Sequence, residues 1–585
     1  MNAAPTSPSL AVRFEHVSFA YPAKGPHNKP HIALRDISFD IHKGEYVCLL
    51  GSNGSGKSTA AQLINGLLLP TKGDVITCGF NTRDADHIFD IRSQAAMVFQ
   101  NPQDQIVADI CTDEVAFGPE NLCLSHDAII QRTDNALAQV ELASLAHSNP
   151  SKLSGGQQQR ISLAGSLAMA PNVLILDEPT AMLDTHHKKS ITTLIQQLHA
   201  QGFTIIHITH DMNDVLQAQR VLAFNQSRLI FDTTPQELFK NPDAVQNLGL
   251  RLPASMQLNH LLDHPQPIAN HAAASQAKDA PAVLEFKHVS YSYKAPSHPS
   301  KFAQMFQSAR KTTQQNYPWA IQDASFSIEA GSFTALIGQS GSGKSTTLSL
   351  SCGLLTPTNG EILFNGKPLA ISLEHGNLFN TIGYVAQSAE HQLFAQTVYE
   401  DIAFGPRNQG LAEKDVEQRV QQSMQLVGLD PTKLATTSPF SLSGGQQKLV
   451  ALAGVLSMNP AVLILDEPLA GLDPAGRHHI LTVLTDLNKR GTTIVLVTHS
   501  IDDAAAYSSH ILAFDQGSVL ASCPTDEFFS NPDYLKQLNF DCPSPMLLAE
   551  SLRNQGYVIN QNPLSLEALA HAITNAPASA QEVCL

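Results

Sequence analysis

The stretch GSNGSGKST, residues 51–59, decides the fold of this chain. It follows the apolar run YVCLL and precedes AAQLINGLL, so the order strand, glycine-rich turn and helix is predicted. Glycines let such a turn curl its N–H groups toward phosphate oxygens, and the helix beginning near Lys57 adds the positive end of its dipole. Lys57 is expected to reach the terminal phosphates and Ser58 to hold Mg²⁺. The alternative is a glycine-rich turn with an exposed lysine.

A second copy of the stretch favours the phosphate-binding interpretation. GQSGSGKST, residues 338–346, follows the strand-like FTALI and precedes the helix-like TLSLSCGLL. Two such loops in one chain predict two nucleotide sites. The predicted loop residues are Gly51, Ser52, Asn53, Gly54, Ser55, Gly56, Lys57, Ser58 and Thr59, and Gly338, Gln339, Ser340, Gly341, Ser342, Gly343, Lys344, Ser345 and Thr346.

The spacing of other motifs shows that a whole domain is duplicated. Lys344 stands 287 residues after Lys57, and Gln387 stands 287 after Gln100. Two LSGGQ pentapeptides, two LDEP tetrapeptides and two histidines at strand ends each recur after 289 residues. We expect a first domain over residues 10–263, a flexible Ala-, Pro- and His-rich linker over 264–281, and a second domain over 282–575.

Each copy is predicted to be α/β. Residues 173–176 are continuously apolar, as in a parallel strand buried on both faces, and residues 204–208 form another strand. Between them, Ile191, Leu194, Ile195 and Leu198 recur at helical spacing. The helix-rich stretch 111–153 is expected to be an inserted helical subdomain. The second copy has 15 extra residues near 294–318, which fit either a solvated loop or a contact with a membrane or partner.

Composition narrows the function classes. The formal net charge of −16 disfavours broad binding to nucleic acid, which requires a basic face. The eight cysteines include no CxxC pair, so a disulfide framework or structural zinc site is not expected. No apolar run is long enough to span a bilayer, and residues 1–10 do not resemble a secretory signal. We therefore expect a cytoplasmic protein that reaches the membrane only through partners.

With LSGGQ the resemblance to a known family becomes specific. Leu153–Gln157 and Leu442–Gln446 resemble the signature motif of ABC-type ATPases. The alternative for each is an N-capped helical turn. The resemblance implies two tandem ABC-type P-loop NTPase domains, each with a RecA-like core, an antiparallel β subdomain and a helical subdomain. It also implies that the signature of one copy completes the nucleotide site of the other, so that the two halves pair within one chain. The implied signature residues are Ser154, Gly155, Gly156 and Gln157, and Ser443, Gly444, Gly445 and Gln446.

The same resemblance assigns catalytic roles to residues at strand ends. Asp177 and Asp466 are expected to bind Mg²⁺, and the adjacent Glu178 and Glu467 to polarise the attacking water. The resemblance implies that Gln100 and Gln387 contact Mg²⁺ or water and that His210 and His499 touch the γ-phosphate. It further implies that Asp184 and Asp473 signal between the domains and that Tyr21 and Tyr293 stack on adenine. Because neither copy lacks one of these groups, we expect Mg²⁺-ATP to be hydrolysed at both sites.

A further element indicates the branch of the family. AFGPEN, residues 116–121, and AFGPRN, residues 403–408, resemble the ATPases of energy-coupling factor transporters, including cobalt and nickel importers. That resemblance implies import of a vitamin or metal ion, with a transmembrane coupling protein docked near residues 100–121 and 387–408 and a small substrate-capture membrane protein. An ordinary turn, with Gly-Pro breaking a helix, is the local alternative. A soluble tandem ABC protein acting on ribosomes or DNA, and the ATPase of a conventional sugar or peptide importer, are the alternatives for the whole chain.

Overall fold

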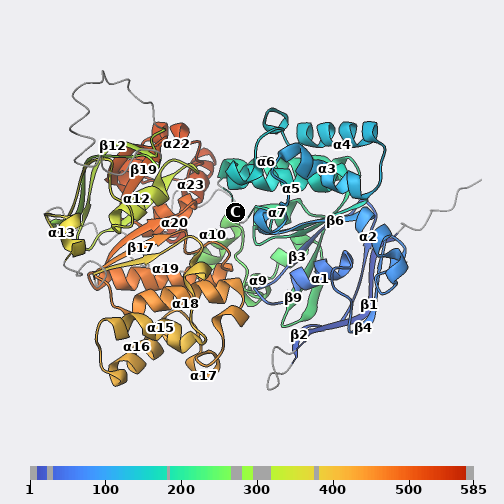
Figure 1. The fold of residues 1–585 in the computed structure, drawn as a ribbon, viewed down its shortest axis with the longest axis horizontal. Coiled ribbons are helices and arrows are strands. Elements are labelled where there is room, and N and C mark those ends of the chain that lie inside the picture. Colours follow the sequence, from blue (N-terminus) through green and yellow to red (C-terminus); the bar gives the residue numbers. More distant parts are fainter. Residues whose placement is uncertain are drawn as a thin grey trace, which may run out of the picture. The chain divides into compact units, whose positions relative to one another are not determined.

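The computed structural model describes residues 10–22, 30–180, 183, 185–264, 280–293, 318–374 and 381–574 (Figure 1). The chain divides into two compact units: the first comprises Met1–Pro253 with the short segment Gly471–Ala475, and the second comprises Ala254–Ala470 and Gly476–Leu585. Most of the expected linker, nearly all of the insert near 294–318 and Asp184 lie outside the described residues. Among the helices described, none combines the length and the hydropathy needed to cross a bilayer.

The first unit is built on a six-stranded sheet in which every strand but one runs parallel to its neighbours. The strand order is β10-β9-β3-β8-β7-β6, and only β10 pairs antiparallel. All residues of β3, β7 and β8 are buried, which explains the apolar run of β3 and of β7 up to Asp177. Strand β8 also buries two polar residues, Thr204 and His207. The strands are β3 (Tyr46–Leu50), β6 (Ala95–Val98), β7 (Val173–Asp177), β8 (Thr204–Ile208), β9 (Arg220–Asn225) and β10 (Arg228–Thr233).

A second, antiparallel sheet of the first unit has the order β2-β1-β4-β5. Its strands are β1 (Leu10–Tyr21), β2 (His31–His42), β4 (Lys72–Thr77) and β5 (Phe80–Asn81). Alternate residues of β1 and β2 are buried, and Phe14 stacks on Phe39 with ring centroids 4.4 Å apart. These side chains share one core with helix α1 (Lys57–Ile64) and the main sheet, so the glycine loop before α1 is fixed from both sides.

The helical subdomain of the first unit consists of α3 (Cys111–Asn121) and α4 (His126–Gln139), which pack on each other and on α5 (Gly155–Ala168). In Figure 1 this group lies at the opposite end of the unit from strands β1, β2 and β4. The expectation of a helical insertion is confirmed. The remaining helices are α2 (Ile88–Gln94), α6 (Thr185–Ala200), α7 (Met212–Gln217), α8 (Pro235–Phe239) and α9 (Pro242–Asn247).

The Gly-Pro step does not break the helix, so the turn interpretation of AFGPxN is wrong. Helix α3 continues through Pro119 to Asn121. Gly118 permits close packing, because a Cβ there would lie 2.6 Å from Cγ of Met169. In the second unit α15 (Val398–Asn408) passes through Pro406 in the same way.

The second unit repeats both sheets. Its main sheet has the order β16-β17-β18-β13-β19-β20 and its antiparallel sheet β12-β11-β14-β15. The strands are β11 (Ala282–Tyr291), β12 (Ile321–Glu329), β13 (Phe333–Gly338), β14 (Asn359–Phe364), β15 (Lys367–Pro368), β16 (Ile382–Val385), β17 (Val462–Asp466), β18 (Thr493–Val497), β19 (His510–Asp515) and β20 (Ser518–Pro524). The helices are α12 (Lys344–Ser351), α13 (Leu369–Glu374), α15, α16 (Glu413–Leu426), α17 (Pro431–Leu434), α18 (Gly444–Ser457), α19 (Pro474–Lys489), α20 (Ile501–Tyr507), α21 (Thr525–Ser530) and α22 (Pro532–Gln537).

The second unit also contains a cluster of three helices, one of which we expected in the first domain. Helix α10 (Ala254–Asp263) packs on α24 (Leu566–Thr574) and α23 (Ser544–Asn554). Leu258 of α10 is buried with Ala549 and Leu569. The expected first domain ran to residue 263, whereas the compact first unit ends at Pro253 because the apolar face of α10 is covered by these two helices.

Candidate active sites

Both glycine-rich loops have backbone conformations that require glycine. Gly51 has φ 142° and Gly56 has φ 109°. A Cβ on Gly51 would lie 2.1 Å from the carbonyl oxygen of Phe224, and one on Gly56 would lie 2.5 Å from that of Ala33. The loop is therefore pressed against the main sheet on one side and the antiparallel sheet on the other.

The lysine of each loop is buried, so the alternative of an exposed lysine is wrong. Lys57 is 5% exposed, and its Nζ donates to the carbonyl oxygens of Gly51 at 2.7 Å and Ser52 at 2.9 Å. Lys344 is 6% exposed and donates in the same way to Gly338 at 2.9 Å and Gln339 at 2.7 Å. Burial lowers the pKa of Lys57, while the Glu178 and Asp177 carboxylates oppose that shift. Each ammonium group thus sits inside its loop, beside buried acids.

The strand-end aspartates lie against the loop serines. Ser58 hydrogen-bonds to Asp177, the last residue of β7, and Ser345 to Asp466, the last residue of β17. Burial raises the pKa of Asp177 to about 6 and raises that of Asp466 as well. Among the described residues Oδ1 of Asp466 is buried and has no hydrogen-bond partner. An exposed serine hydroxyl beside a buried carboxylate offers the oxygen ligands that Mg²⁺ prefers.

Glu178 is held by Gln100 and His210, two residues that the resemblance had assigned to Mg²⁺ or water and to the γ-phosphate. Nε2 of Gln100 donates to Oε2 of Glu178 at 2.9 Å, and Nε2 of His210 lies 2.9 Å from Oε1. Burial alone would raise the pKa of Glu178, but the contact with His210 and the charge of Lys57 outweigh it and keep that pKa below its ordinary value. The carboxylate is therefore ionised and both of its oxygens are oriented.

The second copy reproduces this arrangement. Nε2 of Gln387 donates to Oε2 of Glu467 at 3.3 Å, and Nε2 of His499 lies 2.7 Å from Oε1. Burial alone would raise the pKa of Glu467, but the contact with His499 and the charge of Lys344 outweigh burial, so the pKa lies below its ordinary value. The three side chains come from the ends of β16, β17 and β18, which are adjacent in the sheet.

A feature of both glutamates was not predicted. Glu178 has φ 47° and Glu467 has φ 49°, values that residues with a Cβ rarely adopt. The backbone N–H of Glu178 donates to the carbonyl oxygen of Ile208 at 2.9 Å, and that of Glu467 to Val497 at 3.2 Å. The left-handed turn aims the side chain across the strand ends. Its only local signal is the strand ending in Asp-Glu-Pro, which does not specify the sign of φ.

The signature serines cap helices, as the local alternative proposed. The Ser154 side chain accepts from the backbone N–H of Gln157 at 3.4 Å, and the Gln157 side chain accepts from the backbone N–H of Ser154 at 3.0 Å. Ser443 and Gln446 form the same reciprocal pair at the start of α18. Capping leaves the first N–H groups of each helix oriented along its axis and so does not conflict with phosphate binding.

The two predicted adenine-stacking tyrosines lie beside the loops. Oη of Tyr21 is 3.2 Å from Oγ1 of Thr59, and Oη of Tyr293 is 3.1 Å from Oγ1 of Thr346. Tyr293 is 66% exposed, so one face of its ring is available. Within each unit the loop, the strand-end acids, the glutamine, the histidine and the tyrosine are thus brought to one region.

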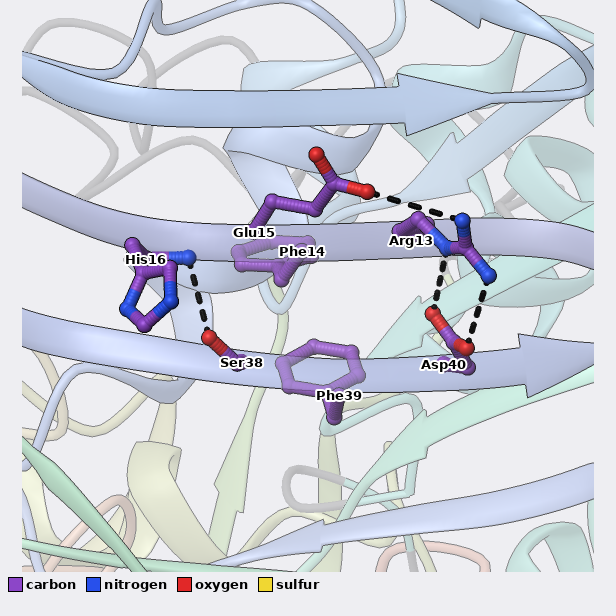
Figure 2. Close-up of a pocket in the computed structure, with 7 residues that line it drawn as sticks. All are labelled: Arg13, Phe14, Glu15, His16, Ser38, Phe39 and Asp40. Carbon is purple, nitrogen blue, oxygen red and sulfur yellow. Dashed lines mark hydrogen bonds and ion pairs between the residues drawn. The ribbon is translucent and has the colours of Figure 1, made fainter.

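A shallow depression on the antiparallel sheet is separate from these groups. It is lined by residues 13–16 of β1 and 38–40 of β2 (Figure 2). Its charged groups are paired, because Arg13 donates two hydrogen bonds to Asp40, at 2.9 and 3.1 Å, and one to Glu15. None of the predicted site residues lines it.

Comparisons with known proteins agree with this geometry. The family model described as ABC transporter matches residues 34–181 and 321–470. A protein of Bifidobacterium longum, assigned as an ABC transporter ATP-binding protein, is 38% identical over 535 residues, covering 86% of this chain and 65% of the relative's length. One from Methanosarcina mazei with the same assignment is 30% identical over 572 residues, covering 94% and 95% of the two chains.

Two solved structures are also similar. CbiO1 from Clostridium perfringens, described as part of the ABC transporter complex CbiONQ, is 32% identical and covers 43% of this chain and 99% of its own, with a TM-score of 0.37. The ATP-binding cassette MJ0796, a dimer bound to ADP and phosphate, is 29% identical and covers 38% and 98%, with a TM-score of 0.36. On the family model and the relatives, this chain belongs to the ABC transporter family and carries two ATP-binding, ATP-hydrolysing domains in tandem.

Proposed function

We propose that this ATPase powers the import of a micronutrient, a vitamin or a metal ion, through a transporter of the energy-coupling factor type. Its partners in this proposal are a transmembrane coupling protein and a small substrate-capture membrane protein, and it works at the cytoplasmic face of the cell membrane. The observation that carries the proposal is the pair of exposed phenylalanines in the AFGPxN helices. Phe117 is 52% exposed and Phe404 is 50% exposed.

The neighbours of these phenylalanines all have structural roles, which leaves the phenylalanines themselves without one. Ala116 and Pro119 are buried in α3, and Gly118 packs on Met169. Within the segment 116–119 the Phe117 side chain is the exposed one, although exposure of a large apolar side chain is unfavourable in water. Such residues mark surfaces that another protein covers.

Exposed apolar side chains near each phenylalanine enlarge the two surfaces. Val107 is 68% exposed in the first copy, and Phe394, 287 residues later, is 59% exposed in the second. The rings of Phe394 and Phe404 meet edge to face with centroids 4.8 Å apart. We expect an apolar helix of the coupling protein on each surface.

We further propose the division of labour at each ATP site. The N–H groups of the loop and Lys57 or Lys344 bind the phosphates, and Tyr21 or Tyr293 stacks on the adenine. Mg²⁺, held by Ser58, Gln100 and Asp177 or by Ser345, Gln387 and Asp466, would neutralise the charge of the phosphates.

Glu178 and Glu467 act as general bases in this proposal. Each is ionised and oriented by a glutamine and a histidine, so a water placed beside its carboxylate is polarised for attack. His210 and His499 then have two tasks in this proposal: each orients its glutamate through Nε2, and each contacts the γ-phosphate, as the resemblance implies. The pairing of each signature with the other copy's loop, which the resemblance implies, stays a prediction, as does the role of Asp184 and Asp473 between the domains.

Fractionation of the cells that produce the protein tests the transport proposal. The intact chain is expected to sediment with membranes and to bring down one coupling protein and one small membrane protein. The double variant Phe117→Asp/Phe404→Asp should move to the soluble fraction. Ile230→Asp is the matched control, because Ile230 is 49% exposed on β10, outside α3. Circular dichroism would check that all variants are folded.

Two outcomes would overturn the proposal. Co-sedimentation with ribosomes that is lost at high salt would place the chain among soluble tandem ABC proteins. Recovery of two large permeases and a binding protein would make it the ATPase of a conventional importer.

A further inference from the structure

The signature helices of the two copies are attached to their surroundings by different side chains. Arg160 of α5 corresponds to Leu449 of α18, 289 residues later. Ser190 of α6 corresponds with the same spacing to His479 of α19. The two positions have therefore changed together, although the motifs around them have not.

In the first copy, the guanidinium group of Arg160 connects three helices. Its Nη1 donates to the carbonyl oxygen of Val140, at the C-terminal end of α4, at 3.4 Å and to the Glu141 carboxylate at 3.3 Å. Its Nη2 donates to Oγ of Ser190 on α6 at 2.7 Å. Arg160 is only 9% exposed, so its bonds to Val140 and Ser190 are largely shielded from water, whereas the Glu141 side chain is 77% exposed.

In the second copy, two other residues make the corresponding connections. Nε2 of His479 on α19 lies 2.9 Å from the carbonyl oxygen of Leu426, the last residue of α16. Nζ of Lys448 on α18 donates to the carbonyl oxygen of Ala470 at 2.8 Å, in the segment between β17 and α19. Histidine thus replaces arginine at the end of the helical subdomain, and lysine secures the signature helix.

The two solutions differ in strength. A permanent cation at the C-terminal end of α4 interacts favourably with the helix dipole, and its hydrogen bonds are charge-assisted. His479 makes a single contact at an exposed position. The first copy therefore has the stronger contact at this end of the helical subdomain, whereas in the second copy the permanent cation, Lys448, contacts the segment after β17 instead.

We propose that Arg160 is a positioning residue for the signature motif of the first copy, and that His479 with Lys448 performs this task in the second. Helix α5 begins directly after Ser154, and α6 follows the segment that carries Glu178. Arg160 touches neither residue. It fixes the helix that carries the signature relative to the helix that leaves the catalytic strand.

The test uses the full chain and transplants the second copy's solution into the first. The variants are Arg160→Leu, Arg160→Leu/Ser190→His and the conservative Arg160→Lys. Hydrogen exchange of the amides at the end of α4 and in the first turn of α5 is measured without nucleotide, followed by kcat and KM for ATP.

For Arg160→Leu, we expect exchange to accelerate about tenfold, which corresponds to the loss of one charge-assisted hydrogen bond. We expect kcat to fall about three- to tenfold with KM changed less than about twofold, because the loop and Lys57 are untouched. The double variant should recover at least half of both losses, and Arg160→Lys should lie between wild type and Arg160→Leu. Lys448→Gln, which installs the first copy's residue, should accelerate exchange in the first turn of α18.

The proposal is overturned if Arg160→Leu leaves exchange unchanged, or if Ser190→His gives no recovery. Faster exchange with unaltered kcat would also overturn it, because Arg160 would then be structural only. The exchange measurement needs no membrane partner, and hydrolysis is independent of the transported substrate. Failure of the transport proposal therefore leaves this test unaffected.

Discussion

The two copies differ more in the interior behind their catalytic groups than in those groups themselves. Glu178 and Glu467 each have a glutamine on one carboxylate oxygen and a histidine at the other. Both adopt left-handed backbone conformations. These contacts are the same in both copies because each joins particular atoms, and no other side chain would place the same atoms there.

The interior behaves differently. In the first copy Oη of Tyr46 on β3 is 3.0 Å from Nδ1 of His207 on β8, and both residues are buried. The corresponding residues of the second copy, Phe333 and Leu496, are apolar. A core requires filled volume and paired polar groups, and either solution supplies these. Differences between the copies therefore identify positions where more than one set of side chains serves, and identities identify candidates for chemistry.

The largest expected effect comes from removing the groups that are identical. In Glu178→Gln and in Glu467→Gln, hydrolysis at the altered site should fall by about 10² to 10⁴, because the general base is lost while the side chain keeps its size. Single-turnover measurements on both variants and on the double variant separate the two sites. Each single variant should still hydrolyse one ATP rapidly at its unaltered site. If either change leaves its own site active, that glutamate is not the base.

A smaller effect is expected from the titration of Asp177. Its pKa of about 6 means that it becomes protonated below that pH, and a protonated carboxyl binds Mg²⁺ poorly. In the Glu467→Gln background, the Mg²⁺ concentration for half-maximal turnover should rise about tenfold per pH unit below pH 6. The free energy of unfolding depends on pH in the opposite direction from Mg²⁺ binding. Because the pKa of Asp177 is raised in the folded state, this group stabilises the folded state below its unfolded pKa, and that contribution is lost as the pH rises through about 6.

The control for this titration is the other copy. Burial also raises the pKa of Asp466, so the Glu178→Gln background should show a shift in the same direction. A half-saturating Mg²⁺ concentration that stays constant between pH 7 and 5.5 in both backgrounds would argue against these aspartates as metal ligands.

The parts of the sites that were predictable from sequence depend on local patterns. The loop glycines, the lysines and the strand-end acids all follow short apolar runs, and a buried parallel strand followed by glycine-rich turn and helix specifies its own geometry. Each of these features occurs in both copies, which strengthened the prediction of two nucleotide sites.

The parts that were missed depend on distant packing. The left-handed φ of Glu178 is imposed by a hydrogen bond to the neighbouring strand, and Arg160 connects helices that are far apart in sequence. Helix α10 joins the second unit because Leu258 is buried beside Leu569, more than 300 residues later. No window of sequence around these residues contains that information.

A prediction about the interior sharpens the comparison between the copies. Tyr46→Phe leaves buried His207 without its partner and should lower the free energy of unfolding of the first unit by about 1–3 kcal/mol. Burial already lowers the pKa of His207, so the ring stays neutral and does not regain a partner by protonation. Tyr46→Phe/His207→Leu copies the second unit and should recover most of the loss, as urea denaturation would measure. If the double variant loses as much free energy of unfolding as the two single variants together, the apolar pair does not fit this interior.

The smallest expected effect concerns a pair that is repeated and yet exposed. Nδ1 of His16 lies 2.8 Å from the Asp36 carboxylate, and His288 and Asp323 repeat the pair at the same distance. All four side chains are at least 70% exposed, so solvent screens the interaction. His16→Ala and His288→Ala should each change the melting temperature by less than about 2 °C and leave hydrolysis unchanged. A larger effect on hydrolysis would mean that this surface takes part in the reaction, and that identity between the copies indicates chemistry even on the antiparallel sheet.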